Sequence, residues 1–536
     1  MSIKKLIISF SITAIVGLLT VTGILWLRQA GPDAYPVLAD EQDTQTEAGS
    51  ILLPEYSPEY LSEPTPEEAL IRKITGYLFW SSSLQISHSL QSIRDKLSTF
   101  ALEELQELYD LHIPPSQLYD FLFSPPEPVV HTARLAFVGD VMAHQEQLTA
   151  AQVSESVFDF HYKFRYIAPY IRAADFAIAN LETTLVHPGQ TRFAGWPLFR
   201  SPQALAEALL YAGFDYVTTG NNHSFDAGVA GVRSTIEILN DVGLGFTGTF
   251  LTPECRYVPT IVQVGEFTFG LLSVTMHTNA IDLGHYNYMM KIVYHDLVEQ
   301  SQIDYEMIYE AIARLRAEEP DFIIVLPHIG IEYYGTMNQR GGGHQWDFFD
   351  RRDTRWVNWM RTMHFFLEAG ADIVMNHHPH TLLPAEFVYI TEPDGTVRRA
   401  FMAYSMANFV SAQRTQPRET SAVFYIDFER TDDGPATIVG ASYVPIWVRQ
   451  HDPTRDGLDF TVLPVTSTLR RVEAGNHADL RQQDIERMRV VHNDVTHMLS
   501  GEPIPLEYMQ YEYPITRYRM REQFPGLPLW GTLPWR

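Results

Sequence analysis

The sequence predicts an α/β protein built on a largely parallel sheet, preceded by an N-terminal transmembrane helix and a small helical region. Three observations support this prediction. From Ala133 onward, short β-rich runs alternate with helical stretches, which is the pattern of βαβ units. Between Ile86 and Tyr119, apolar residues recur near helical spacing. Close to the N-terminus stands an uncharged run long enough to cross a bilayer.

Composition narrows the class of protein. The chain has 536 residues, which allows two or three domains. Its 45% apolar and 19% charged residues exclude a wholly disordered chain and a multi-span membrane protein. A formal net charge of −26 repels polyanions, so no nucleic-acid partner is expected. The single cysteine, Cys255, permits neither an intrachain disulfide nor a thiolate zinc knuckle.

The first element is a predicted membrane anchor over residues 1–29. Lys4 and Lys5 precede a predominantly apolar run at residues 6–27, which can span a hydrocarbon core of about 30 Å. The run is longer than that of a cleavable signal and lacks a small-x-small exit. We therefore expect a single-pass protein of the cell membrane, with the lysines inside and the bulk outside. Cleavage of the segment, giving a secreted protein, is the alternative.

Two further segments lead to the main domain. Residues 30–66 are acidic and Pro-rich without Lys or Arg, which predicts a disordered linker. Residues 67–124 are predicted to form a small helical region, because Pro66-Glu67-Glu68 is typical of a helix start and apolar residues follow at helical spacing. A Pro-rich break at residues 125–128 ends this region.

The main domain is predicted to span residues 131–450, with a C-terminal extension at 451–536. Apolar strands alternating with helices predict a parallel sheet that is buried on both faces. The expected strands are 135–138, 176–179, 216–219, 322–326 and 373–375, and the expected helices are 164–173, 202–212, 229–242, 305–317 and 355–369. Two antiparallel strands, 420–429 and 437–448, are expected to close the domain, and the extension is expected to hold one helix near 483–499.

Polar side chains follow all five predicted parallel strands. In such sheets ligands bind beyond the carboxyl ends of the strands. A single Asp after a strand is usually a helix cap, and a single His is usually structural. Independent caps, however, would not be expected to place a carboxylate, a carboxamide or an imidazole at every strand end of one sheet. The residues at these ends are Asp140, His144, Asn180, Glu182, Asn222, His223, Asp226, His328, Glu332, His378 and His380. The set therefore favours a functional site.

The residue types point to metal chemistry. Carboxylates, carboxamides and imidazoles without thiols suit Mn, Fe, Zn or Mg ions. His378-Pro379-His380 can present two imidazoles to metal ions. A carboxylate from a neighbouring strand end can bridge two ions about 3.5–4 Å apart, the arrangement that stabilises a phosphoryl transition state and activates water. We expect two divalent ions as cofactors.

Six motifs occur in order along the chain and resemble those of the CapA family. They are Gly-Asp-Val-Met at 139–142, Asn-Leu-Glu at 180–182, Asn-Asn-His-x-x-Asp-x-Gly at 221–228, His-x-Gly-x-Glu-Tyr at 328–333, His-His-Pro-His at 377–380 and Tyr-Ser-Met-Ala-Asn-Phe at 404–409. CapA proteins serve poly-gamma-glutamate capsule biosynthesis and fall within the calcineurin-like metallophosphoesterase superfamily. The resemblance implies a four-layer αββα sandwich with two mixed sheets and a dinuclear metal site. Many members are exported and membrane-anchored, which agrees with the predicted anchor.

The resemblance also implies roles for individual residues. The implied metal ligands are Asp140, Glu182 as the bridge, Asn222, His328, His378 and His380. His223 resembles a general acid and Asp226 its orienting partner. His144, Glu332 and Asn408 are implied as supporting or substrate-facing residues, with a structural role left open for His144 and a ligand role for Glu332. His377 is expected to face away from the metals, because alternate extended residues point to opposite sides.

Two departures from the family pattern bear on the site. Asn376 and Ala407 stand where the family usually has Gly. CapA proteins also lack the Asp-x-His first motif of other phosphoesterases, so the second ligand of the first metal is not identified, and phosphatase activity does not follow from the fold.

Three functional hypotheses remain open. The first is a membrane-tethered, metal-dependent hydrolase or transferase outside the cell, acting on a phosphoester or amide-type bond. The second is a non-catalytic metal-binding component of a capsule polymer synthesis and export complex, and the third is a surface phosphoesterase with no capsule role. The expected partners are the membrane, capsule synthesis membrane proteins and an anionic polymer, although the net negative charge opposes the polymer.

Overall fold

The computed structural model divides into two compact units, residues 1–128 and 129–536. It describes residues 65–79, 90–110, 114–123, 128–279, 281–295, 302–334, 354–392, 394–413, 417–432, 434–451 and 457–520. The predicted anchor and most of the predicted linker lie outside these residues. Among the described helices, none is long and apolar enough to cross a membrane.

The described residues of the first unit form four helices. These are α2 (Pro66–Phe79), α3 (Leu90–Leu97), α4 (Leu102–Asp110) and α5 (Pro115–Phe123). A capping box begins α2: the Glu68 amide donates to Thr65 Oγ1 at 3.2 Å, and the Thr65 amide donates to Glu68 Oε2 at 3.1 Å. Buried leucines and isoleucines from all four helices form the core, including Leu70, Ile93, Leu105 and Leu118.

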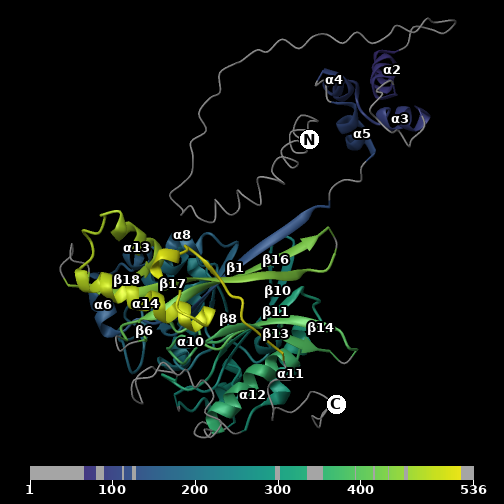
Figure 1. The fold of residues 1–536 in the computed structure, drawn as a ribbon. Coiled ribbons are helices and arrows are strands. Elements are labelled where there is room, and N and C mark those ends of the chain that lie inside the picture. The colour runs from purple at the N-terminus through teal and green to yellow at the C-terminus, as the bar shows by residue number, and fades with distance from the viewer. Residues whose placement is uncertain are drawn as a thin grey trace, which may run out of the picture. The chain divides into compact units, whose positions relative to one another are not determined.

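The second unit is built on two large mixed sheets (Figure 1). The first has the order β18-β17-β16-β1-β4-β7-β8, and the second has the order β20-β13-β14-β12-β11-β10-β9. Strands of the first sheet are β1 (Val130–Val141), β4 (Phe176–Leu181), β7 (Tyr216–Thr218), β8 (Gly245–Thr247), β16 (Thr420–Thr431), β17 (Thr437–His451) and β18 (Leu458–Pro464), with β15 (Asn408–Val410) and β19 (Tyr513–Pro514) at its side. Strands of the second are β9 (Thr260–Val264), β10 (Phe267–Thr275), β11 (Phe322–His328), β12 (Ile373–Met375), β13 (Ala385–Thr391), β14 (Val397–Ala403) and β20 (Tyr518–Met520).

Each sheet has a parallel part and an antiparallel part. In the first sheet β1, β4, β7 and β8 are parallel, and β16, β17 and β18 continue antiparallel from β1. In the second, β10, β11, β12 and β14 are parallel, flanked by antiparallel β9 and β13. The α/β class is confirmed. The expectation of one largely parallel sheet, drawn from the alternation of strands and helices, is wrong, because the β11 and β12 segments pair with β10 and β14 in a second sheet. The presence of two mixed sheets agrees with what the family resemblance implied.

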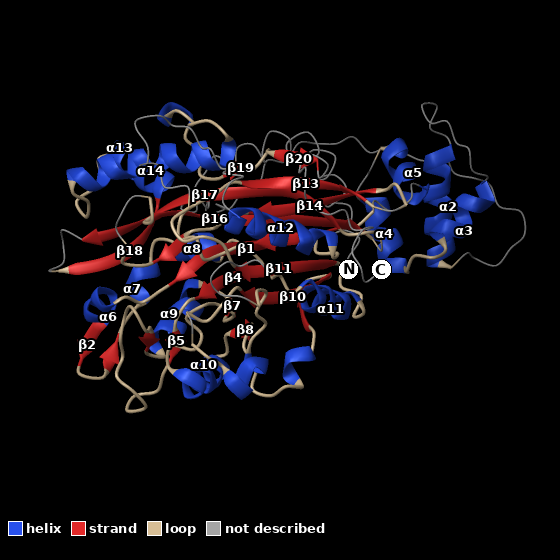
Figure 2. Ribbon diagram, turned by 90° about the horizontal axis from the view of Figure 1, so that it is seen from below, coloured by secondary structure: helices blue, strands red, loops and turns tan. Residues whose placement is uncertain are grey.

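The two sheets pack face to face between layers of helices, which Figure 1 shows edge-on, whereas Figure 2 looks at the strands face-on from below. Phe137 of β1, Phe269 of β10 and Ile324 of β11 belong to one buried cluster, which therefore lies between the sheets. The outer face of the first sheet is covered by α6 (Gln145–Ala151), α7 (His161–Phe164), α8 (Ala168–Ile171), α9 (Ala204–Ala212) and α10 (Gly228–Val242). The outer face of the second is covered by α11 (Tyr305–Arg316) and α12 (Thr354–Glu368).

Several predicted elements differ from the observed ones. The helix expected at 164–173 is two short helices, α7 and α8, and Pro169 stands in the first turn of α8, where its missing N–H breaks no helical bond. The C-terminal extension holds two helices among its described residues, α13 (Val465–Glu473) and α14 (Gln482–Ser500), rather than one. Two short strand pairs and three turns complete the described part of the unit. The antiparallel pair is β2 (Gln152–Ser154) with β3 (Val157–Phe158), and the parallel pair is β5 (Thr184–Leu185) with β6 (Arg200–Ser201). The 3-10 turns are Cys255–Tyr257, Gly284–Met289 and Leu506–Tyr508.

Candidate metal centre

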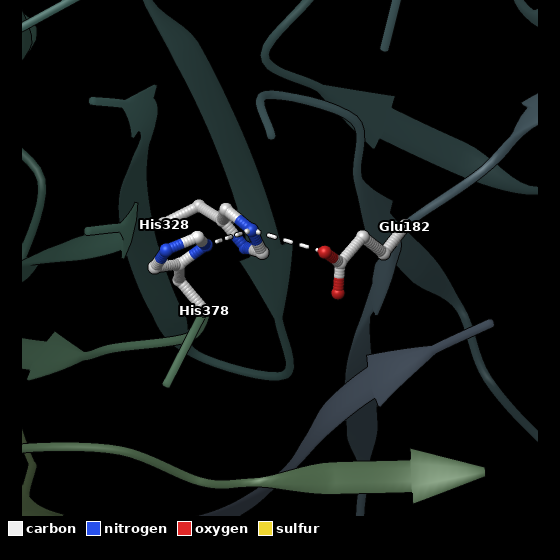
Figure 3. A group of neighbouring side chains, drawn as sticks. All are labelled: Glu182, His328 and His378. Atoms are coloured by element: carbon white, nitrogen blue, oxygen red, sulfur yellow. Dashed lines mark hydrogen bonds and ion pairs between the residues drawn. The ribbon is translucent and has the colours of Figure 1, made fainter. Parts of the chain in front are cut away.

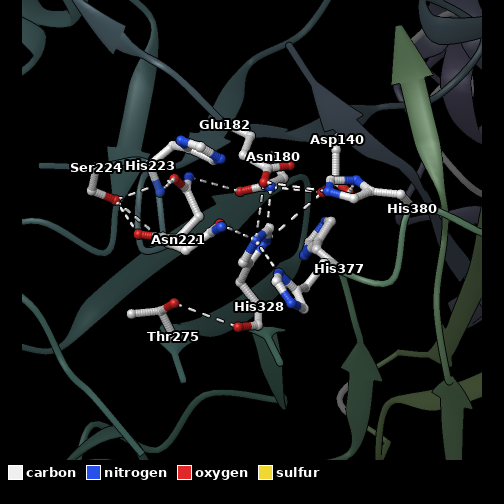
Figure 4. Close-up of polar contacts among 12 residues, drawn as sticks. Asp140, Asn180, Glu182, Asn221, His223, Ser224, Thr275, His328, His377 and His380 are labelled. Atoms are coloured by element: carbon white, nitrogen blue, oxygen red, sulfur yellow. Dashed lines mark hydrogen bonds and ion pairs between the residues drawn. The ribbon is translucent and has the colours of Figure 1, made fainter. Parts of the chain in front are cut away.

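The predicted strand-end residues gather at one place in the second unit (Figure 4). Asp140 lies near the end of β1, and Glu182 directly follows β4. His328 ends β11 of the second sheet, and His378 and His380 follow β12. Because parallel strands bring their carboxyl ends to one edge, and the two sheets face each other, residues far apart in sequence meet here.

Two groups of three side chains have the spacing of metal ligands. One consists of Glu182, His328 and His378, and the other of Asp140, Glu182 and His380. All are buried, and within each group the ligand atoms lie within 4.8 Å of one another. His328 Nε2 lies 3.3 Å from Glu182 Oε1 and 3.2 Å from His378 Nδ1 (Figure 3). Ligands held about 2.1 Å from one ion are separated by about 3.0–3.4 Å, so these distances suit a shared cation.

Glu182 belongs to both groups, and its surroundings are the clearest indication that a cation fits between them. Neither of its carboxylate oxygens has a hydrogen-bond partner among the described residues, although the residue is fully buried. An uncompensated buried carboxylate is costly. Burial, and next the adjacent Asp140, raise the pKa of Glu182 well above its ordinary value. A cation between the two groups would satisfy both oxygens.

The imidazoles are in the form that binds metals. Burial holds the pKa values of His328 and His378 well below the ordinary range, so both rings are neutral, the protonation state in which an imidazole binds a metal. Burial alone would raise the pKa of Asp140, but its hydrogen bond with His380 and the nearby imidazoles lower it to about 2. The donor set therefore fits two divalent cations.

His380 is oriented by two acceptors. Its Nδ1 lies 3.1 Å from Asp140 Oδ2 and 2.9 Å from Asn408 Oδ1. Because both partners are acceptors, Nδ1 carries the hydrogen and Nε2 is left as the ligand atom. The second oxygen of Asp140 accepts from Asn180 Nδ2 at 2.8 Å, and Asn180 Oδ1 accepts from Thr218 at 2.9 Å, which fixes the direction of the amide.

Asn222 brings a carboxamide oxygen to the second group. Its Oδ1 lies 2.8 Å from His328 Nε2, and its Nδ2 donates to Asn279 Oδ1 at 3.0 Å. The second contact decides which end of the amide faces the imidazoles. Asn279 adopts a left-handed backbone conformation with φ of 51°, and nothing in the strand-end pattern pointed to it.

His223 and Asp226 form a buried pair beside the two groups. His223 Nδ1 lies 2.6 Å from Asp226 Oδ2, and the same oxygen accepts from the Phe199 amide at 2.6 Å. The His223 amide donates to Asn221 Oδ1 at 3.1 Å, which holds the turn that carries the ring. Burial raises the pKa of Asp226, an effect that its hydrogen bond with His223 opposes.

The remaining predicted residues lie at the margin. His144 begins α6, where its Nδ1 lies 3.3 Å from Gln147 Oε1 and accepts from the Ala412 amide at 3.3 Å; burial lowers its pKa to about 4. Glu332 is exposed and belongs to neither group. His377 also lies outside both groups, with Nδ1 3.2 Å from the Pro327 carbonyl oxygen.

The two departures from the family pattern have distinct local effects. Asn376 uses its side chain, since Nδ2 donates to the carbonyls of Ile329 at 3.0 Å and Tyr404 at 2.8 Å and so joins three strand ends. Ala407 has a φ of 60°, a conformation that favours glycine. Its carbonyl accepts from the Asp140 amide at 2.9 Å, so this strained residue supports the ligand-bearing end of β1.

Some neighbours of the centre were not predicted. The Arg418 guanidinium lies 3.4 Å from the ring centroid of Tyr333, whose ring lies 5.8 Å from that of His380. The ring of His277 lies 5.9 Å from that of His378. Tyr333 stands in a recognised motif, but Arg418 and His277 follow no predicted parallel strand, so only the tertiary structure reveals them.

Comparison with known proteins identifies the family. The model of the bacterial capsule synthesis protein PGA_cap matches residues 134–341 and 357–413. The chain belongs to the CapA family. It is 27% identical over 300 residues to the PGA biosynthesis protein CapA of Bacillus subtilis (strain 168), covering 54% of this chain and 66% of that protein. It is 23% identical over 346 residues to the capsule biosynthesis protein CapA of Bacillus anthracis, covering 62% and 70%.

This CapA-family chain thus spans about two thirds of the length of these relatives. A solved structure of a hypothetical protein from Thermus thermophilus aligns with 58% of the chain and 98% of its own, with 14% identity and a TM-score of 0.31. At that TM-score the likeness carries no weight. All six motifs fall within the residues that the family model matches.

Proposed function

We propose that this CapA-family chain is a metal-dependent hydrolase of the calcineurin-like phosphoesterase type. Its second unit would act outside the cell, tethered to the membrane by the N-terminal segment. The observation that carries the proposal is Glu182, a buried carboxylate with no hydrogen-bond partner among the described residues and shared by two ligand groups. A shared carboxylate between two such groups is the arrangement that a two-ion hydrolytic site requires.

The residues divide into two metal positions. Asp140 and His380 would hold one ion, and His328, His378 and Asn222 the other, with Glu182 between them. Two divalent ions there would supply Lewis acidity that polarises the scissile bond and activates water. The carboxylate, carboxamide and imidazole donors suit Mn, Fe, Zn or Mg ions.

His223 is placed to move a proton. Asp226 Oδ2 lies 2.6 Å from Nδ1, so the carboxylate holds the hydrogen on Nδ1 and stabilises the positive charge of the doubly protonated ring. Nε2 then gives its proton to the departing oxygen of the substrate. The Phe199 amide, which donates to the same Asp226 oxygen, fixes the carboxylate.

Metal analysis together with hydrolysis of a chromogenic phosphodiester tests the proposal. We expect the wild-type protein to retain divalent metal and turn the substrate over. His223→Ala should keep the metal and lower kcat by roughly 10²-fold or more. His285→Ala, which changes an exposed histidine, is the matched control and should leave both unchanged. Bound metal without turnover on any phosphoester would contradict the proposal.

The names of the relatives favour a second candidate. Both are described by biosynthesis, and neither name mentions hydrolysis. We propose as the alternative a non-catalytic, metal-binding component of a capsule polymer synthesis and export complex, whose partners would be membrane proteins and an anionic polymer. Capsule formation in a complemented strain separates the two. The alternative predicts that His223→Ala supports capsule formation as well as wild type, whereas the hydrolase predicts that it does not.

A further inference from the structure

A cavity away from the two ligand groups is lined by three cations and three carboxylates. It lies among β8, β9, β10 and α11 and has a volume of about 250 Å³. Arg256, Lys291 and Arg314 all line it. Among the residues that the structure describes, none of the three is within ion-pair distance of a carboxylate. Three cations around one small cavity repel each other, and an anion between them would relieve that repulsion.

Two of the cations are held in place by uncharged groups. Arg256 Nη1 donates to the carbonyl oxygens of Asn287 at 2.9 Å and Met290 at 2.6 Å. Lys291 Nζ donates to the Arg256 carbonyl at 2.6 Å and lies 4.0 Å from the centroid of the Phe250 ring. These contacts fix the charged ends without neutralising them. Burial, followed by the charges of Arg256 and Arg314, lowers the pKa of Lys291 to about 7, which reports the same lack of a counter-charge.

The lining also contains one small polar residue of β10. Ser273 is 1% exposed, and its hydroxyl has no hydrogen-bond partner among the described residues. That hydroxyl packs against Gly220 and Gly248, which do not line the cavity, so the polar groups offered to a ligand are those of the cations.

The acidic residues of the cavity do not replace the anion. Asp304 caps α11, where its Oδ1 accepts from the Met307 amide at 2.9 Å. Glu306 and Glu310 lie on the exposed side of α11. Asp304 is half-buried, as Arg256 and Lys291 are, so the half-buried part of the charged lining has two cations to one carboxylate and is positive overall. The volume is below the range of about 300–1,000 Å³ that is common for drug-sized ligands, which favours a small molecule.

We infer that this cavity is a second ligand site, separate from the candidate metal centre, which binds a small oxyanion bearing carboxylate or phosphate groups. Lys291, Arg256 and Arg314 provide the positive charge. Guanidinium and ammonium groups bind both kinds of oxyanion, so the shared chemistry defines the ligand class.

Calorimetric titration of the full-length protein at low salt tests this inference, with inorganic phosphate and succinate as separate probes. We expect at least one probe to bind, and the difference between them to show which oxyanion is preferred. Lys291→Met and Arg314→Gln should each weaken binding by about tenfold or more. Arg314 is exposed, so its variant remains informative if Lys291→Met fails to fold. Arg233→Gln changes another exposed arginine and is the matched control, expected to bind as wild type.

Asp140→Asn distinguishes this cavity from the metal centre. If phosphate binds in the cavity, the variant keeps its affinity for phosphate even where metal is lost. Binding that disappears in Asp140→Asn and persists in Lys291→Met and Arg314→Gln would overturn the inference and place the anion at the metals. Absence of binding by either probe at millimolar concentration would overturn it as well. Neither result bears on the hydrolase proposal, which rests on turnover.

Discussion

At the scale of single residues, Glu182 is the side chain whose surroundings are hardest to explain without a bound cation. Its two oxygens are buried and have no hydrogen-bond partner among the described residues, whereas its neighbour Asp140 has a hydrogen-bond partner for each oxygen. Burying such a charge lowers the free energy of unfolding. An ion that binds only the folded state raises that free energy again. The residue therefore links stability to metal binding.

We predict that Glu182→Gln raises the melting temperature of the chelated protein, because the isosteric amide removes the uncompensated charge. The same variant should lose most of the stabilisation that added Mn²⁺ or Zn²⁺ gives wild type. Thermal melts with and without metal check both parts. Glu306→Gln, on the exposed side of α11, is the control and should behave as wild type. A metal-dependent shift of full size in Glu182→Gln would contradict the shared-ligand assignment.

Arg418 is a second residue whose contacts imply a role. Its guanidinium stacks on Tyr333, next to His380, and its Nε is buried without a hydrogen-bond partner among the described residues. We predict that Arg418→Gln raises KM for an anionic substrate by about tenfold while bound metal is unchanged, because a charged donor beside the centre is lost. Steady-state kinetics and metal analysis measure this. An equal rise in KM for an uncharged ester would argue against charge recognition.

At the scale of elements, the end of β1 is fixed by close backbone packing. A Cβ added at Gly139 would lie 1.8 Å from the carbonyl oxygen of Ala407, whose backbone holds the Asp140 amide. The glycine thus allows the strand and the segment before β15 to approach each other, and the ligand at the next position depends on that approach.

Gly139→Ala is accordingly predicted to destabilise the protein by about 3 kcal/mol or more, since backbone must move on one side. Gly440→Ala in β17 is the matched control, because its added Cβ would meet only the Asp427 carboxylate, at an ordinary 3.7 Å. Chemical denaturation of both variants gives the comparison. If both variants had the same free energy of unfolding, β1 and the segment before β15 could move apart at little cost, which would contradict the prediction.

The segment between β10 and α11 carries Lys291, whose pKa falls from an ordinary 10.5 to about 7 on folding. Between these values the unfolded chain holds the proton and the folded chain does not, so stability rises with pH across that window. We predict that the free energy of unfolding of wild type relative to Lys291→Met increases from pH 7 towards pH 10. Lys96→Met, at an exposed position of α3, should show no such trend. A flat difference for Lys291→Met would contradict the lowered pKa.

At the scale of the whole molecule, the net charge of −26 opposes the approach of anions to both sites. Long-range repulsion is screened by salt, whereas contacts with buried cations are screened less. We predict that kcat/KM for an anionic phosphodiester rises when ionic strength is increased from low to physiological values, and that the value for a neutral ester does not. Stopped-flow or steady-state assays over a salt series check this. A fall in kcat/KM for the anionic substrate would indicate local attraction instead.

The sequence predicted parts of this molecule well and others poorly, for physical reasons. The sequence singled out Asp140, Glu182, His328 and His380, which the structure brings together, because buried parallel strands are apolar and the polar residues that end them stand out. The residue pattern did not show that the strands pair into two sheets, because hydrophobic alternation identifies strands without naming their partners. Two sheets were expected only from the family resemblance. Asn279 and Arg418 lie on irregular segments, where no periodicity marks a residue, so their contacts follow only from the tertiary structure.

The two ligand groups each draw on both sheets: Asp140 and Glu182 come from the first, and His328, His378 and His380 from the second. Bound ions would therefore act as cross-links that tie the two halves of the sandwich at one edge. Removal of metal should speed amide hydrogen exchange at the ends of β4, β11 and β12 together, more than in the interior between the sheets. The ions would set how readily the sandwich opens there, and thus how often the edge admits solvent.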